Sequence, residues 1–168
     1  MFQRLRGIFG AKSKQDALTA VLENAAREAI EDLDFDDPAV RTGVSLQMIL
    51  SKQFDLIGKP EGEFPYTPPF ATDKARGALL GTSIAIVRQQ FGDLEQQAIT
   101  DAAVAAFCLA YGSENGRFYA LQTLKDSADG NEDVNFASDW AIKDTDGPNS
   151  SDGIATPVAF YLAVAEMI

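Results

Sequence analysis

The sequence predicts an all-α protein, a single-domain bundle of six or seven helices with irregular (orthogonal or mixed) packing and no substantial sheet. Apolar residues recur at helical spacing along most of the chain, which is the main sequence signal of amphipathic helices. The segments open at Ser, Thr or Asp and close at Gly, the residue types that cap helices. Strand signals are nearly absent, because no two alternating runs flank a tight turn. We place this helical domain at residues 13–168, after a basic segment at 1–12 that we expect to be flexible.

The first two predicted helices begin at clear N-terminal signals. Ser13 followed by Asp16 resembles a capping box, and a stripe of Leu and Ala then continues to about Leu33. Asp37 as N-cap, with proline at the first helical position, opens a second helix that ends at Gly58. Its inner stripe contains Leu46, Leu50, Phe54 and Ile57.

Residues 59–71 form a connector rather than a helix. They contain four prolines among three aromatic residues, and proline removes the backbone donor that a helix interior needs. The segment also contains a PxxP spelling at 65–68, which ligands of SH3-type grooves use. The neighbouring charges are Glu61 and Glu63 instead of arginine. We therefore interpret the connector as a stiff segment that lays its aromatics over the core of the same domain.

The third predicted helix starts at Thr72 and stops at Gly92, and its expected inner face contains Leu80, Ile84, Val87 and Phe91. Gly77, Gly81 and Ala85 follow at four-residue steps and make a strip without side-chain bulk. Glycine inside a helix costs about 1 kcal/mol relative to alanine, so this strip needs an offsetting role. We interpret it as a surface for close helix packing. The alternative is the floor of a ligand groove or a contact in a dimer. Gly43, in the second helix, raises the same question.

A fourth helix is predicted from a capping box of Asp93 and Gln96 to Gly112. Between residues 98 and 111 only Thr100 and Asp101 are polar, so we expect this to be the central, most buried helix. Asp101 is the one acid whose neighbours suggest a desolvated carboxylate. It also follows Gln97 by one turn, and the two can point outward together.

Three further helices complete the bundle. Ser113 is the predicted N-cap of the fifth, which ends near Gly130 and has Phe118, Leu121 and Leu124 facing inward. The sixth spans residues 132–142 and pairs Phe136 with Trp140, four residues apart on one face. After a loop at 144–155, Thr156 and Pro157 begin the last helix.

The chain contains no histidine, and Cys108 is its only cysteine. These two residue types supply most ligands for zinc, copper and non-haem iron, and histidine passes protons near neutral pH. The lack of histidine and of a second cysteine excludes Ser-His-Asp and Cys-His nucleophiles, tetrahedral zinc sites and cysteine-bound iron–sulfur clusters. We assign no catalytic residue and expect no cofactor.

The net charge of −11 is unevenly distributed. The only charges in residues 1–14 are the basic side chains of Arg4, Arg6, Lys12 and Lys14, so the remaining 154 residues hold 10 bases against 25 acids, or −15. An acidic body repels phosphate backbones, so we expect no nucleic-acid binding and favour a basic protein partner. The segment 1–12 can fold back on this body or make peripheral contact with an anionic membrane. A cytoplasmic protein is expected, because the lone cysteine forms no internal disulfide and the apolar windows are too short to cross a bilayer.

One acidic loop has part of a calcium-binding pattern. Oxygen donors occupy calcium-loop positions 1, 3, 5 and 7, as Asp129, Asn131, Asp133 and Asn135. Position 6 is Val134 where glycine is needed, and position 12 is Trp140 where a bidentate glutamate belongs. Weak calcium binding is therefore a further alternative beside solvated polar turns.

These observations favour a non-catalytic protein that acts through protein–protein interaction, and they are compatible with a homo-oligomer. The alternative is a carboxylate-dependent enzyme or small-ligand receptor with a pocket near Gly77 and Gly81, close to Asp101. A closed apolar cavity holding a convergent carboxylate would favour the alternative. An apolar patch with a polar rim would favour association.

Overall fold

The structure is a computed structural model that describes residues 34, 36–92, 95–147 and 157–167. The chain divides into two compact units, residues 1–35 and residues 36–168. All described residues except Asp34 belong to the second unit. The predicted first helix and the basic segment 1–12 lie outside the described residues, so the predicted domain boundary at residue 13 stays a prediction.

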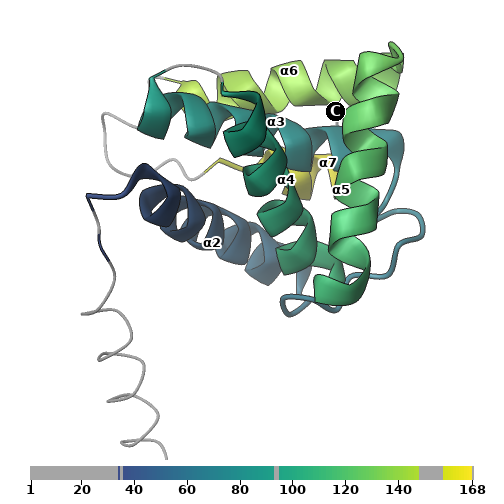
Figure 1. Ribbon diagram of the computed structural model, residues 1–168. Helices are drawn as coiled ribbons and strands as arrows, with labels where there is room; N and C mark the ends of the chain where they lie inside the picture. The colour runs from purple at the N-terminus through teal and green to yellow at the C-terminus, as the bar shows by residue number, and fades with distance from the viewer. Residues whose placement is uncertain (1–33, 35, 93–94, 148–156, 168) are drawn as a thin grey trace, which may run out of the picture. The chain divides into compact units, whose positions relative to one another are not determined.

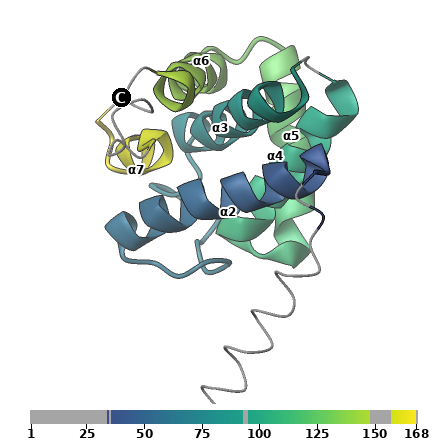
Figure 2. The ribbon, with the colours of Figure 1, turned by 90° about the vertical axis from the view of Figure 1, so that its left-hand side faces the viewer.

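The described part of the chain contains six helices and no strand, which confirms the all-α prediction (Figure 1). The helices are α2 (Pro38–Ile57), α3 (Asp73–Phe91), α4 (Gln96–Tyr111), α5 (Ser113–Ala128), α6 (Glu132–Asp146) and α7 (Ala159–Val164). Figure 2 shows α2 and α3 side by side at the centre of the second unit, with α6 and α7 at one side and α4 and α5 at the other.

The central helix is α3, and the prediction that the helix at 98–111 is the most buried one is wrong. Helix α3 contacts each of the other five described helices, and every residue from Ala75 to Ser83 is buried. Its small side chains admit neighbours on several sides, and the hydroxyl of Ser83 donates to the carbonyl of Leu79 at 2.9 Å. Overall hydrophobicity therefore pointed to the wrong helix, because side-chain size decided which helix the others surround.

Helices α3 and α6 approach closely along the glycine strip. A Cβ atom at Gly77 would overlap the carbonyl oxygen of Val134, and one at Gly81 would overlap that of Ser138. Ala85, the next member of the strip, is fully buried. The backbone of α6 thus occupies the space that side chains would fill, as the close-packing interpretation predicts.

Local capping signals predicted several helix ends correctly. The carboxylate of Asp37 accepts a hydrogen bond from the backbone N–H of Ala39 at 2.8 Å, and α2 ends at Gly58 in the left-handed conformation. The hydroxyl of Thr72 accepts from the N–H of Ala75 at 3.1 Å at the start of α3. These contacts involve residues within one turn of each other, so a local sequence pattern is sufficient to reveal them.

Four predicted boundaries are wrong, and one of them is the start of the last helix, which is Ala159 rather than Pro157. Ser113 is the first residue of α5 rather than its N-cap, a position that Gly112 takes. Gln96 is the first residue of α4 rather than its third. Helix α6 continues to Asp146, so residues 144–146 are helical instead of part of a loop.

The last turn of α6 contacts the start of α7. The carboxylate of Asp144 accepts from the N–H groups of Val158 and Ala159, at 2.7 and 3.0 Å. The side-chain oxygen of Gln53, on α2, accepts from the next two, Phe160 and Tyr161, at 2.8 and 3.2 Å. Side chains from two other helices therefore satisfy the N–H groups at the start of the last helix, which otherwise lack partners.

The connector packs its aromatics against the core, as predicted. Phe64 is buried among the rings of Phe54, Phe70 and Phe160. The connector also donates backbone hydrogen bonds to the end of α4, from Gly62 to the carbonyl of Leu109 at 2.7 Å and from Phe64 to that of Ala110 at 3.1 Å. These bonds satisfy carbonyl groups that a helix C-terminus leaves open.

The predicted inner face of α5 is wrong for Phe118 and Leu121 and correct for Leu124, which is partly buried and packs against the core. Phe118 is 65% exposed and Leu121 is 46% exposed, whereas the buried residues of the helix are Gly116, Ala120 and Thr123. A Cβ at Gly116 would overlap the backbone of Cys108, so α5 lies too close to α4 for large side chains between them. The small residues take the positions nearest to α4, and Phe118 and Leu121 face outward.

Candidate functional site

The ligand-groove alternative for the glycine strip finds no space in the structure, because the backbone of α6 lies against Gly77 and Gly81. Asp101 does not lie at this strip. It belongs to an open pocket between α2 and α4, which is the candidate site described below.

The α2/α4 pocket has a volume of about 280 Å³ and an apolar floor. Leu46 from α2 and Ala102 from α4 are buried at its base. Gly43 also lines it, and a Cβ added there would meet nothing within 4 Å. The second unexplained glycine of the sequence therefore borders open space, in contrast to Gly77 and Gly81. The described residues that line it are Ala39, Thr42, Gly43, Leu46, Phe91, Glu95, Gln97, Ala98, Asp101, Ala102 and Ala105.

The rim of the pocket is acidic. Glu95 and Asp101 are exposed, and the described residues that line the pocket include no Lys or Arg. The side-chain amide of Gln97 donates to the carboxylate of Asp101 at 2.9 Å. Asp101 thus points outward with Gln97, and the expectation of a desolvated carboxylate is not met. One polar lining residue, Thr42, is buried and uses its hydroxyl on the carbonyl of Pro38 at 2.8 Å.

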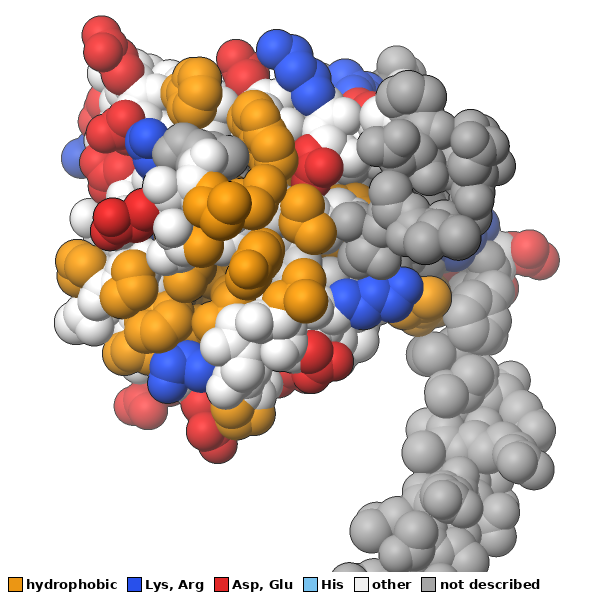
Figure 3. All heavy atoms as spheres, turned by 180° about the vertical axis from the view of Figure 1, so that it is seen from behind, with side chains coloured by type: hydrophobic (Ala, Val, Ile, Leu, Met, Phe, Trp, Pro, Cys, Tyr) orange, Lys and Arg blue, Asp and Glu red, His pale blue; other side chains and the backbone are white. Residues whose placement is uncertain are grey.

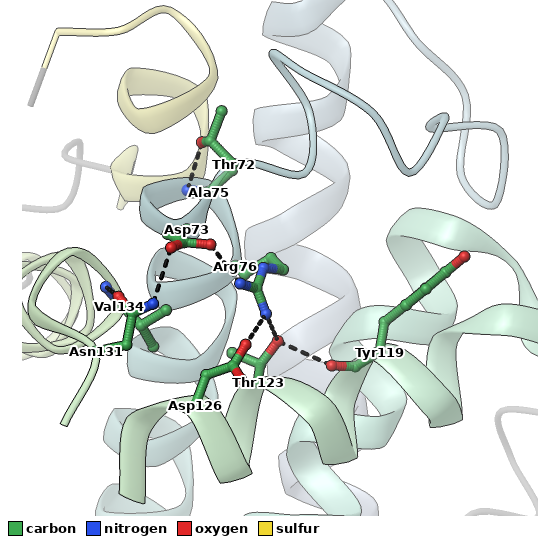
Figure 4. Close-up of polar contacts among 9 residues, drawn as sticks. All are labelled: Thr72, Asp73, Ala75, Arg76, Tyr119, Thr123, Asp126, Asn131 and Val134. Atoms are coloured by element: carbon green, nitrogen blue, oxygen red, sulfur yellow. Dashed lines mark hydrogen bonds and ion pairs between the residues drawn. The ribbon is translucent and has the colours of Figure 1, made fainter. Parts of the chain in front are cut away.

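A second polar cluster surrounds Arg76 on α3 and was missed by sequence reasoning (Figure 4). Arg76 is buried, and its guanidinium donates to Asp73, to Asp126 at 2.6 Å and to the hydroxyl of Thr123 at 3.1 Å. Asn131, the N-cap of α6, donates to Asp73 at 2.8 Å. The cluster joins α3, α5 and α6. A lone arginine between Ala75 and Gly77 was the one signal that could have revealed it.

Electrostatics indicate that this cluster is structural. Hydrogen bonds from Asn131 and Arg76 lower the pKa of Asp73 below its ordinary value. The guanidinium of Arg76 donates to two carboxylates and to Thr123 of its own chain, so its charge is already paired within the fold. We assign the cluster to stability rather than to binding.

Three tyrosines pack together where the connector meets α4 and α5. Tyr66 of the connector stacks on Tyr119 of α5 and meets Tyr111 of α4 edge to face. The hydroxyl of Tyr111 donates to the carbonyl of Phe70 at 2.7 Å. Burial raises the pKa of Tyr111 and, to a smaller extent, that of Tyr66. The hydrogen bond holds the connector against the end of α4.

The residues of the predicted cation loop are spread over two helix ends. Asp129 is exposed after α5, Asn131 caps α6, and Asp133 lies in the first turn of that helix. Asn135 exchanges hydrogen bonds with Ser127, from the Ser127 hydroxyl at 2.6 Å and to the Ser127 carbonyl at 3.2 Å. Within the described ranges, no three acidic, His or Cys side chains gather closely enough to hold a metal ion. Calcium binding stays a prediction without geometric support.

The basic residues predicted to contact a membrane or partner (Arg4, Arg6, Lys12 and Lys14) lie outside the described residues. Of the helices that the structure describes, none combines the length and the apolar composition needed to cross a membrane.

Hydrophobic side chains also gather on the face shown in Figure 3, over α7, the connector and the C-terminal end of α2, with acidic side chains around the edge. Leu56, near the end of α2, and Met167, after α7, are 58% and 67% exposed. Exposed apolar patches with a polar rim are typical of interaction surfaces.

Comparisons with known proteins found no matching family model, no similar curated protein and no similar solved structure.

Proposed function

We propose that this protein acts by binding another protein, and that the α2/α4 pocket receives an apolar side chain from a basic segment of that partner. The observation that carries the proposal is the combination of an apolar floor with a rim formed by Glu95, Gln97 and Asp101. An apolar anchor in a pocket surrounded by polar groups is the usual arrangement of binding energy at protein interfaces.

The size of the pocket supports a side-chain anchor. Pockets for small molecules commonly span about 300–1,000 Å³ and bury most of the ligand. This pocket has about 280 Å³ and is open to solvent. A single Leu, Met or Phe side chain fits such a volume, with its backbone remaining outside. The exposed position of Asp101 argues against the receptor alternative, which requires a carboxylate converging into a closed cavity.

The charge of the rim supports a basic partner. The described lining residues include two carboxylates at the entrance and no base, and the net charge of the chain is −11. Lys or Arg residues flanking the anchor would approach Glu95 and Asp101, and complementary charge raises the association rate most strongly at low salt. A cytoplasmic location, inferred from the absence of a disulfide pair, remains part of this proposal.

The test uses a probe peptide of defined chemistry, an amphipathic helix with Leu anchors flanked by Lys, and an otherwise identical peptide flanked by Glu. Fluorescence polarisation should show binding of the Lys peptide, weaker at higher salt, and little binding of the Glu peptide. NMR shifts of the Gly43 and Asp101 amides should accompany it. Equal binding of both peptides, or shifts confined to other surfaces, would refute the proposal.

Two variants test separately how the floor and the rim of the pocket contribute to peptide binding. Gly43→Leu fills the pocket and should abolish binding while leaving the fold intact, because leucine favours a helix over glycine. Asp101→Lys should weaken binding of the Lys peptide and strengthen that of the Glu peptide. Asp139→Lys, the same charge change at an exposed position of α6, is the matched control and should change affinity only slightly.

A further inference from the structure

The outward face of α5 carries a narrow stripe with an apolar centre and opposite charges at its two ends. Glu114, Phe118, Leu121 and Lys125 are all exposed. They follow at steps of four, three and four residues, which places them on one side of a helix. The stripe spans about 16 Å at 1.5 Å per residue.

The described part of the chain does not cover this stripe. Phe118 and Leu121 are 65% and 46% exposed, and neither Glu114 nor Lys125 forms an ion pair with another described residue. In Figure 1, α5 runs along the right-hand edge, with no other described helix in front of it. Phe118 and Leu121 therefore form a small exposed apolar patch between the two charged ends of the stripe.

The stripe can pair with a second, antiparallel copy of itself, because its apolar residues then face each other and its opposite charges also face each other. When a second α5 is laid antiparallel across a two-fold axis between residues 119 and 120, Phe118 meets Leu121 of the partner subunit. Glu114 then meets Lys125 of the partner subunit, and each contact occurs twice. The steps of four and three are those of a coiled-coil seam, in which antiparallel helices pack apolar side chains in this manner. A two-fold contact needs this self-complementarity.

We propose that α5 associates with α5 of a second copy of this chain in an antiparallel, two-fold symmetric contact. Phe118 and Leu121 form its centre, and two Glu114–Lys125 pairs close its ends and fix the antiparallel direction. A parallel pairing would place like charges opposite each other at both ends, which disfavours it.

The proposal goes beyond the proposed function and uses a different surface. Helix α4 contacts both α2 and α5 and lies between them in Figures 1 and 2, so the α2/α4 pocket stays open in the dimer. One helix pair buries less than the roughly 1,200 Å² of a stable standard-size interface. The dimer is therefore a weak one, with a dissociation constant on the order of 100 μM.

Sedimentation equilibrium of the full chain from 10 μM to about 1 mM tests the proposal through charge reversal. Glu114→Lys and Lys125→Glu each convert both end pairs to repulsion and should weaken self-association about tenfold or more. An equimolar mixture of the two single variants should dimerise like the wild type, because the heterodimer pairs opposite charges at both ends. The double variant Glu114→Lys/Lys125→Glu should also recover it.

Phe118→Asp/Leu121→Asp removes the centre and should leave a monomer at all concentrations. All substituted side chains are exposed, so circular dichroism and the melting temperature should confirm an intact fold in every variant. A monomeric wild type at about 1 mM would overturn the proposal. So would a dimer that persists in the Phe118/Leu121 variant, or a mixture of single variants that associates no better than either alone.

Discussion

The guanidinium of Arg76 donates a 2.6 Å hydrogen bond to the carboxylate of Asp126, 50 residues further along the chain. Arg76 is buried on the central helix α3, and Asp126 lies near the end of α5. This contact connects α3 with α5 across the core. A buried charge is tolerated only when its partners are in place, so the pair should matter for stability.

Replacing Arg76 with methionine should lower the free energy of unfolding by about 2–4 kcal/mol. The change keeps the apolar stem but leaves Asp126 and Asp73 without their common partner. Urea denaturation at pH 7 measures the effect. Arg88→Met is the control, because Arg88 is exposed where it pairs with Asp146 and should contribute less than about 1 kcal/mol. An equal loss of unfolding free energy in the two variants would contradict the structural role of Arg76.

Gly81→Ala should lower the free energy of unfolding by about 2–3 kcal/mol, because its Cβ would overlap the carbonyl of Ser138 and force α6 away from α3. Gly43→Ala is a matched control in another helix, where the added Cβ meets open space. That change should raise stability by up to about 1 kcal/mol through helix propensity. Chemical denaturation measures the free energy of unfolding of both variants. Changes of the same sign in the two variants would be inconsistent with the described packing.

Asp73 should make the protein sensitive to acid. Its pKa in the folded state is lowered from 3.8 by hydrogen bonds from Asn131 and Arg76. The unfolded chain therefore takes up the proton first as pH falls. The stabilisation is present above pH 3.8 and is lost as pH falls through the lowered folded-state pKa. Asp73→Asn should flatten the acid limb of stability measured by urea denaturation. An unchanged slope below pH 4 would refute this role.

Tyr111 should make the protein sensitive to alkali. Burial raises its pKa above the ordinary value of 10.0, so the unfolded chain releases the phenolic proton first as pH rises. Stability should fall above about pH 10, through the interval up to the raised folded-state pKa. Tyr111→Phe should lower the free energy of unfolding by about 1–2 kcal/mol at pH 7, because the carbonyl of Phe70 loses its hydrogen-bond donor.

The same variant should show a shallower decline above pH 10 than the wild type. Tyr161→Phe is a suitable control, since Tyr161 is only partly buried. Stability curves from pH 7 to 11 that are parallel for the wild type and Tyr111→Phe would contradict the prediction.

Several helix ends were predictable because capping is local. Asp37 reaches the N–H of Ala39 two residues away, and Thr72 reaches that of Ala75 three residues away. The end of α6 was not predictable in this way. Asp144 stays helical while it caps α7, fourteen residues further on, and that contact exists only after the two helices meet.

The candidate site was visible in the sequence only as separate residues. Gly43 and Asp101 stood out as an unexplained helical glycine and an acid in an apolar helix, and both line the pocket. Their association requires α2 and α4 to lie side by side, which no local pattern encodes. The exposed stripe on α5 was misassigned, because hydrophobicity predicts that Phe118 and Leu121 face inward.

The sequence by itself determined the all-α class, several helix limits, the acidic charge and the absence of histidine chemistry. These properties depend on composition and on interactions within one turn of a helix. The tertiary structure decided which helix is central, which face of α5 is buried, and which residues share the pocket. The reason is that packing depends on the distance between backbones, and glycines such as Gly81 and Gly116 set that distance through contacts with other helices.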